Sequence, residues 1–201
     1  MSVTHSDTEI PLPTLVGLRT ADEPAAWEAL GFVVNDRRVD VGAIRITLGA
    51  PGKGITSWAI DGIPPTDDID GLSTTEGSPP SMPISHPNGA TGIDHVVVVT
   101  PDFDRTATAL KAHGMALKRT RDAGGFRQGF RRLGPAILEL VEAKNAPDGP
   151  ARFWGLVVIV SDFEALGEAI GEVRDAVQPG RRIATLKAFA GLTEAVAFMT
   201  P

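Results

Sequence analysis

Two titratable side chains stand inside apolar runs of the sequence. His95 lies near the start of the run Ile93–Val99, and Glu139 lies in the middle of the run Ala136–Val141. Continuous aliphatic runs of this length are typical of buried strands. An isolated buried charge is strongly unfavourable, so each group must be paired, neutral or bound to a ligand. A histidine and a carboxylate on two strands of one unit therefore indicate a shared site.

Three interpretations of this pair remain open at the level of sequence. A divalent cation that is to be chelated by a substrate needs three or four protein ligands, and His95 and Glu139 supply two. The pair could instead be a hydrogen-bonded core pair, or a metal-free pair in a ligand pocket with Glu139 as general base. The residues that could supply a third ligand are Glu142, Gln128, Gln178 and His86.

Arginines and one tryptophan are the candidates for substrate binding. Arg127 and Arg131 lie on or beside a strand expected over 128–133, and Arg182 lies on a strand expected over 182–186. Strand side chains alternate between faces, so one arginine of each neighbouring pair (131–132 and 181–182) can enter a cleft and bind a carboxylate or phosphate. A solvated edge or a salt bridge is the competing role for each arginine. Trp154 could wall the pocket.

The elements that position these residues follow a repeated β-α-β-β-β pattern. After a loose leader over 1–11, we expect a degenerate module over 12–62 and two paired modules over 92–143 and 151–201. Residues 63–91 are rich in proline and serine, which favours a linker or a long ordered loop. A repeat of this kind predicts an α+β fold with curved mixed sheets around a cleft and helices on their outer faces.

Composition narrows the class of protein. The net charge of −6 and a pI near 5.2 argue against nucleic-acid binding, and no run is long enough for a membrane span. The absence of cysteine excludes disulfides, thiolate metal sites and cysteine nucleophiles from this chain. Met1 to Glu9 is polar and acidic where a signal peptide would be basic and then apolar, so we expect a cytoplasmic protein.

The runs that carry His95 and Glu139 resemble those of the vicinal oxygen chelate superfamily, the glyoxalase and bleomycin-resistance group. The resemblance rests on the stretches Gly92–Val98 and Arg131–Glu142, with a Pro101-Asp102 helix start between them. The segments Gly180–Thr185 and Ala197–Pro201 are similar to a glyoxalase-like group of actinobacterial proteins. The resemblance implies that His95 and Glu139 take the metal-ligand positions of the first and last strands of one module. It implies one divalent ion, namely Zn, Mn, Fe, Ni or Mg.

The chain departs from that pattern in the partner module. Gly155 stands where the resemblance places a second histidine, and the last strand, 195–198, has no carboxylate. Half of a metal site is thus present. The resemblance implies an enzyme of lyase, isomerase or dioxygenase type that acts on a small oxygen-bearing metabolite, or, as the alternative, a non-catalytic binding protein of the bleomycin-resistance type. It also leads us to expect a homodimer.

Overall fold

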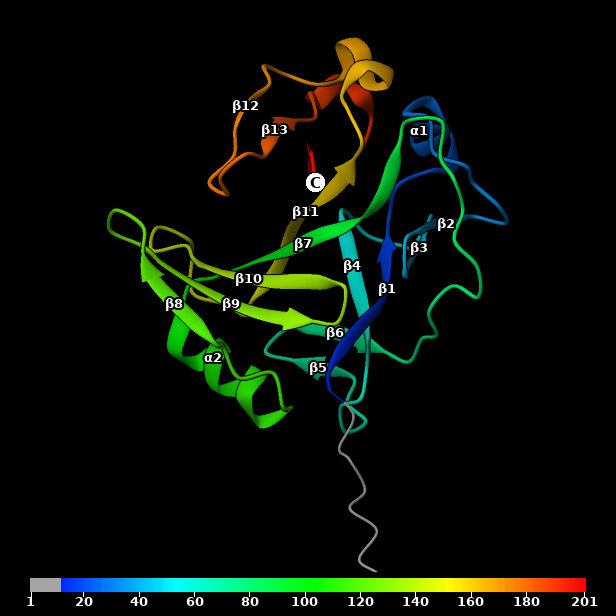
Figure 1. Cartoon of the computed structure of the whole chain (residues 1–201). Coiled ribbons are helices and arrows are strands. Elements are labelled where there is room, and N and C mark those ends of the chain that lie inside the picture. Colours follow the sequence, from blue (N-terminus) through cyan, green and yellow to red (C-terminus); the bar gives the residue numbers. More distant parts are fainter. Residues whose placement is uncertain (1–11) are drawn as a thin grey trace, which may run out of the picture.

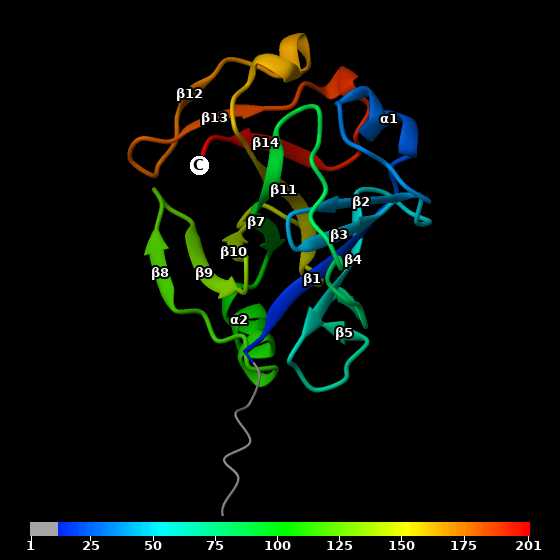
Figure 2. The same ribbon diagram turned by 45° about the vertical axis from the view of Figure 1, so that its right-hand side comes forward.

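The structure, a computed structural model, describes residues 12–201 and consists of two mixed β-sheets (Figures 1 and 2). The leader expected over 1–11, with the signal-peptide argument that rests on it, lies outside the described residues.

The first sheet is built by the N-terminal part of the chain. It has six strands in the order β2-β3-β1-β4-β6-β5. Its elements are β1 (Thr14–Thr20), α1 (Pro24–Ala29), β2 (Arg38–Val41), β3 (Ile44–Thr47), β4 (Ile55–Asp61), β5 (Asp68–Ile69) and β6 (Leu72–Thr75).

The second sheet is built by the rest of the chain and has eight strands in the order β12-β13-β14-β11-β7-β10-β9-β8. The elements of its first half are β7 (Ala90–Thr100), α2 (Phe103–Ala112), β8 (Arg119–Asp122), β9 (Arg127–Leu133) and β10 (Ala136–Glu142). Those of its second half are β11 (Arg152–Val160), η1 (Glu164–Ala169), β12 (Arg174–Asp175), β13 (Arg182–Thr185), η2 (Ala188–Ala190) and β14 (Ala195–Met199).

The two sheets share one pairing scheme. In the second sheet β7 and β11 are antiparallel neighbours, and each pairs in parallel with the last strand of its own module, β10 or β14. In the first sheet β1 and β4 are antiparallel neighbours, and they pair in parallel with β3 and β6. The first sheet is therefore a shortened pair of modules, not the single degenerate module expected over 12–62.

This scheme corrects the expectation for residues 63–91. Within that segment, β5 and β6 complete the first sheet, and Trp58 and Ala59 of β4 pair with Thr74 and Thr75 of β6. Prolines and serines surround these strands and concealed a four-residue strand with alternating burial. The fold class itself, α+β with curved mixed sheets, is confirmed.

The core lies between the sheets, which pack against each other through one apolar face each. The first sheet contributes alternate residues such as Ile44 and Ile46, and the second contributes Leu138 and Leu140. At the seam the rings of Trp58 and Phe153 meet edge to face, with centroids 5.4 Å apart. Each sheet consequently turns its other face outward.

Helices are few in the described residues. The carboxylate of Asp102, which belongs to the helix start noted in the sequence, caps α2 by accepting a hydrogen bond from the Arg105 amide at 3.0 Å. The β-α-β-β-β pattern over 151–201 predicts a helix after its first strand, and the structure has only a short 3-10 segment there, interrupted by Gly167 at φ 48. Within residues 12–201, no helix is long and apolar enough to cross a membrane.

A buried carboxyl pair ties the first sheet to the loop before β14. Asp22 accepts hydrogen bonds from the amide and hydroxyl of Thr193, at 2.8 and 2.7 Å, and from the indole of Trp27 at 3.2 Å. The Thr20 hydroxyl lies 2.9 Å from Glu194 Oε2 and 3.1 Å from Asp22 Oδ2. Burial, with the hydrogen bond and charge of neighbouring Asp22, raises the pKa of Glu194 to about 8.

Candidate active site

His95 and Glu139 lie side by side on the face of the second sheet that points away from the first sheet. His95 comes from β7 and Glu139 from β10, which are parallel neighbours. The His95 Nε2 and Glu139 Oε2 atoms are 3.3 Å apart, and both side chains are largely buried. The structure thus brings together the two residues that the sequence singles out, at a distance suited to the transfer of a proton.

A β-bulge places Asp94 on the same side as its neighbour His95. In the β7–β11 ladder His95 pairs with Val157 and Ile93 pairs with Val158, so Asp94 is an extra residue without a partner. A bulge bends the strand and redirects a side chain, so that two successive side chains can point to the same face of the sheet. Asp94 Oδ2 consequently lies 2.8 Å from Nδ1 of His95.

Arg181 completes this arrangement from the other half of the sheet. Its Nη1 atom donates to Asp94 Oδ1 at 2.7 Å, and its Nε atom donates to the carbonyl oxygen of Thr200 at 2.7 Å. Burial by itself would raise the pKa of Asp94, but hydrogen bonds from His95 and Arg181 and the Arg181 charge outweigh it, and the pKa lies below its ordinary value. Asp94 is therefore ionised and holds the Nδ1 hydrogen of His95, which turns Nε2 toward Glu139.

Glu139 is oriented from its other side by β9 and β8. Gln128 Nε2 donates to Glu139 Oε1 at 2.6 Å. The Gln128 Oε1 atom accepts from Arg121 Nε at 2.7 Å, which fixes the direction of the amide. Arg121 also lies over the ring of Phe130, 5.4 Å from its centroid. Both carboxylate oxygens of Glu139 thus have partners.

The polar pair lines a cavity between the two ends of the second sheet. Figure 2 shows the strands at these ends, β8 and β12, on the same side of the molecule. The cavity has a volume of about 1020 Å³ and is walled on one side by residues of β8 and β9 and on the other by β12 and the loop that follows it. Arg119 and Arg121 enter it from β8, and Arg174 enters it from β12. Among residues 12–201, no carboxylate forms an ion pair with any of these three arginines.

The donor set of this site does not fit the divalent ion implied by the resemblance. In the part of the chain that the structure describes, no cluster of three or more His, Asp and Glu residues has the geometry of a metal site. His95 Nε2 and Glu139 Oε2 face each other at 3.3 Å, and Gln128 turns its amide nitrogen to Glu139 and its oxygen to a guanidinium. Cationic Arg121 beside the pair further disfavours a second cation.

The other residues considered as a third ligand behave in three ways. Gln178 lines the cavity. His86 lies elsewhere, with Nδ1 accepting from the Val33 amide at 3.0 Å and Nε2 3.0 Å from the Asp40 carbonyl oxygen. Glu142 lies away from the cavity, where hydrogen bonds from Arg127 hold its pKa below the ordinary value.

At Gly155, the position where the resemblance places a second histidine, the structure leaves no space for a side chain. It pairs with Ala195 of β14 and with Val97 of β7. A Cβ atom added to Gly155 would lie 2.0 Å from the Ala195 carbonyl oxygen. The backbones therefore approach too closely there for any side chain.

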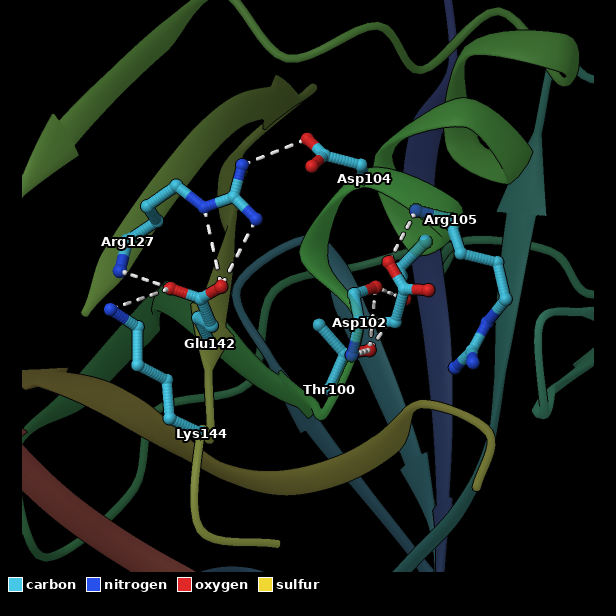
Figure 3. A network of polar contacts seen from close by, with 8 residues as sticks. Thr100, Asp102, Asp104, Arg105, Arg127, Glu142 and Lys144 are labelled. Carbon is cyan, nitrogen blue, oxygen red and sulfur yellow. Dashed lines mark hydrogen bonds and ion pairs between the residues drawn. The ribbon is translucent and has the colours of Figure 1, made fainter. Parts of the chain in front are cut away.

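Arg127 and Arg131, two candidate substrate-binding residues, lie away from the cavity. Arg127 Nη2 is 3.0 Å from Glu142 Oε1, and Nη1 is 2.8 Å from Asp104 Oδ1, so this side chain bridges β10 and α2 (Figure 3). Arg131 pairs with buried Leu138 and shares its face. Residues at alternate positions of β9, not these two, face the site.

Arg182 and Trp154, the remaining candidates, also lie outside the cavity lining. Ile183 lines the cavity, so its neighbour Arg182 points to the other face, where it lies over Phe163 at 5.5 Å from the ring centroid. Trp154 is 53% exposed and is the extra residue of a bulge between Phe153 and Gly155. Neither side chain contributes to the walls around the His95–Glu139 pair.

Sequence reasoning missed Asp94, Arg181 and the arginines of β8 and β12. Asp94 adjoins His95, but strict alternation assigns it to the opposite face, and only the bulge reverses this. The pair 181–182 did supply one arginine to the site, and it is Arg181 instead of Arg182. For β8, the arginines at the alternate positions 119 and 121 could have indicated that both side chains point to one face of the sheet.

No family model and no curated protein matches the sequence. Among solved structures, a variant of 4-hydroxymandelate synthase from Streptomyces coelicolor superposes on 94% of this chain and 93% of its own, with a TM-score of 0.61 and 14% identity. Methylmalonyl-CoA epimerase from Mycobacterium tuberculosis covers 57% of this chain and 90% of its own, with a TM-score of 0.45 and 19% identity. Together with the paired modules described above, the full-length match shows that this chain has the fold of the vicinal oxygen chelate superfamily.

Proposed function

We propose that this protein is an enzyme that moves a proton at a carbon atom next to a carbonyl group of a small anionic metabolite. The observation that carries the proposal is the 3.3 Å approach of His95 Nε2 to Glu139 Oε2 in a cavity of about 1020 Å³. A carboxylate beside an oriented imidazole can take up a proton and pass it on.

The substrate class follows from the charges of the cavity walls. Arg119 and Arg121 on one side and Arg174 on the other surround the pair with guanidinium groups that lack carboxylate partners among residues 12–201. Guanidinium groups bind carboxylates and phosphates through two parallel hydrogen bonds. The three arginines outnumber the two carboxylates of the lining, Glu139 and Asp175, so a 2-oxo acid or a related carbonyl acid matches this cavity in charge.

The reaction step uses groups of this chain. Glu139 takes a proton from the carbon, the electron pair of the broken C–H bond passes into the carbonyl oxygen, and the resulting enolate lies near the arginines. The arginines donate hydrogen bonds to that oxygen, and His95, whose Nδ1 hydrogen is held by Asp94, presents the lone pair of Nε2 to the proton that Glu139 has taken. Return of the proton to the same or a neighbouring atom gives an isomerisation, and loss of a leaving group from the adjacent carbon gives a lyase reaction. The proposal involves no metal ion because the donor set does not fit one.

Exchange of carbon-bound hydrogen for deuterium tests this step without knowledge of the product. The purified protein is incubated in D₂O with pyruvate, 2-oxobutyrate, 2-oxoglutarate or acetoacetate, and the C–H signals are followed by proton NMR. We expect catalysed loss of the signal next to the carbonyl for at least one acid. Glu139→Gln should reduce the rate at least a hundredfold, whereas the exposed control Glu172→Gln should not change it.

A binding protein without catalysis is the second candidate. The observation that favours it is that both oxygens of Glu139 already have partners, Gln128 at 2.6 Å and His95 at 3.3 Å. Such a protein would bind one of these acids, as measured by calorimetry, with no deuterium exchange. Binding that survives Glu139→Gln together with an absence of exchange would select this candidate over the enzyme.

A further inference from the structure

A second hollow lies on the outer face of the first sheet, remote from the His95–Glu139 pair. It has a volume of about 220 Å³. The side chains of Arg19, Arg38 and Arg45 line it, and residues 76–78 form part of its wall, so that one carboxylate, that of Glu76, stands against three guanidinium groups. No role of the cavity on the second sheet involves these residues.

The register of the strands aims two arginines at one point. Arg38 of β2 and Arg19 of β1 both pair with Thr47 of β3, which lies between them. Neighbouring strands are about 4.8 Å apart, so the Cα atoms of Arg19 and Arg38 are about 10 Å apart on the same face. Long guanidinium side chains at that separation can converge on one small ligand above the Thr47 hydroxyl.

Small residues keep the space beside these arginines open. The next row of the sheet places Gly17 against Ala59, and Ala59 against Thr75. A Cβ atom added to Gly77 would lie only 2.5 Å from the Ala59 Cβ, so the backbone of residues 76–78 lies directly against the sheet. On this side the hollow is thus bounded by close backbone packing, and the arginine side chains bound it on the other.

The charges of the hollow are unequally satisfied. Arg45 is held by Asp40 through two hydrogen bonds, 2.8 Å from Nε and 3.0 Å from Nη2. Arg19 and Arg38, by contrast, form no ion pair with any carboxylate of residues 12–201. Two free guanidinium groups on one face are notable in a chain of net charge −6. Like charges this close repel each other and are stabilised by an anion between them.

We propose that this hollow binds a small oxyanion, a phosphate or carboxylate group, between Arg19 and Arg38. Arg45, anchored by Asp40, adds positive potential at the rim, and Thr47 offers a hydroxyl donor. The proposal is independent of the chemistry of the second sheet. It assigns a binding role to the half of the molecule that contains no His95–Glu139 pair.

Titration with two probes tests the site and distinguishes the two oxyanions. Inorganic phosphate and malonate are added separately to ¹⁵N-labelled full-length protein at low ionic strength in chloride buffer, and amide shifts are followed by NMR. We expect saturable shifts at Gly17 and Gly77 with at least one probe. The double variant Arg19→Gln/Arg38→Gln should weaken that binding at least tenfold. The matched double variant Arg132→Gln/Arg152→Gln removes the same charge elsewhere and should change it less than twofold.

Three outcomes would overturn the proposal. The first is the absence of saturable shifts at Gly17 and Gly77 with both probes, and the second is saturation confined to β9, monitored at Gly129. The third is an equal loss of binding in the two double variants, which would indicate a general charge effect. Arg19 and Arg38 are exposed, so circular dichroism and melting curves should show that both double variants fold.

Discussion

Asp94 and Arg181, which lie 87 positions apart in the sequence, meet at 2.7 Å beside His95. One carboxylate thereby accepts from two donors, the guanidinium and the Nδ1–H of the imidazole. Because Asp94 lies in the bulge of β7 and Arg181 lies directly before β13, the contact fixes both the direction of the histidine and the relative position of the two modules.

Replacement of Asp94 should lower the stability of the fold at neutral pH. The pKa of Asp94 is lowered in the folded protein, so its ionised form contributes stability that is present above the unfolded pKa of about 3.9 and is lost as the pH falls through the folded value. We expect Asp94→Asn to lower the free energy of unfolding by about 1–3 kcal/mol at pH 7. Urea unfolding should show this difference shrinking below about pH 4, and exposed Asp148→Asn should show no such difference.

Glu194 should make the protein less stable as the pH rises above 5. Its pKa is raised to about 8 in the folded state, so between the unfolded value and pH 8 the folded protein holds a proton that the unfolded chain has released. The free energy of unfolding should therefore fall with pH in this window, by on the order of 1 kcal/mol per unit, and level off above it. Glu194→Gln should flatten the profile of melting temperature against pH. An unchanged slope would contradict the raised pKa of Glu194.

Gly155 should tolerate no side chain. Gly155→Ala brings a Cβ atom to 2.0 Å from the Ala195 carbonyl oxygen, which requires β11 and β14 to separate. We expect a loss of about 2–3 kcal/mol or more in the free energy of unfolding. Gly92→Ala, on adjacent β7, is the matched control, because its Cβ atom would meet only Ile159 at an ordinary 3.7 Å. Equal stability of the two variants would show that the approach of β11 and β14 is not tight.

Substitution of Arg121 should weaken ligand binding, whereas substitution of Arg127 should affect only the stability of the fold. Arg121 lines the cavity and contacts Gln128, whereas Arg127 binds Glu142 and Asp104 outside it. Calorimetry with whichever 2-oxo acid binds best should show a roughly tenfold weaker affinity for Arg121→Gln. Arg127→Gln should change affinity less than twofold and lower stability by about 1 kcal/mol or less, since the pair is partly exposed. The reverse pattern would return Arg127 to the role that its sequence position suggested.

The paired strands and the proximity of His95 to Glu139 could be predicted because buried strands have recognisable aliphatic runs in the sequence. Both residues interrupt aliphatic runs, and parallel pairing of the first and last strands of a module places them side by side. The positions of Arg127, Arg131 and Arg182 could not be predicted in the same way. A shift of one residue in a strand exchanges its two faces, and arginine is compatible with both.

Asp94 and the first sheet show two further limits of sequence reasoning. A bulge depends on how two strands match in length and curvature, which no local pattern around Asp94 reveals. The strand Leu72–Thr75 is too short for periodicity to distinguish it from a turn, and its neighbours are prolines and serines. The expectations of a homodimer and of cytoplasmic location stay predictions.

The order of strands along the chain has a consequence for how the molecule can be divided. All strands of the first sheet fall between Thr14 and Thr75, and all strands of the second fall between Ala90 and Met199. A backbone cut at Pro79-Pro80 would therefore leave every ladder of hydrogen bonds intact within one fragment or the other. Each fragment would expose the apolar face that it normally buries, so the two halves should reassociate when mixed and regain the contact between Trp58 and Phe153. Fragment complementation is thus built into this topology.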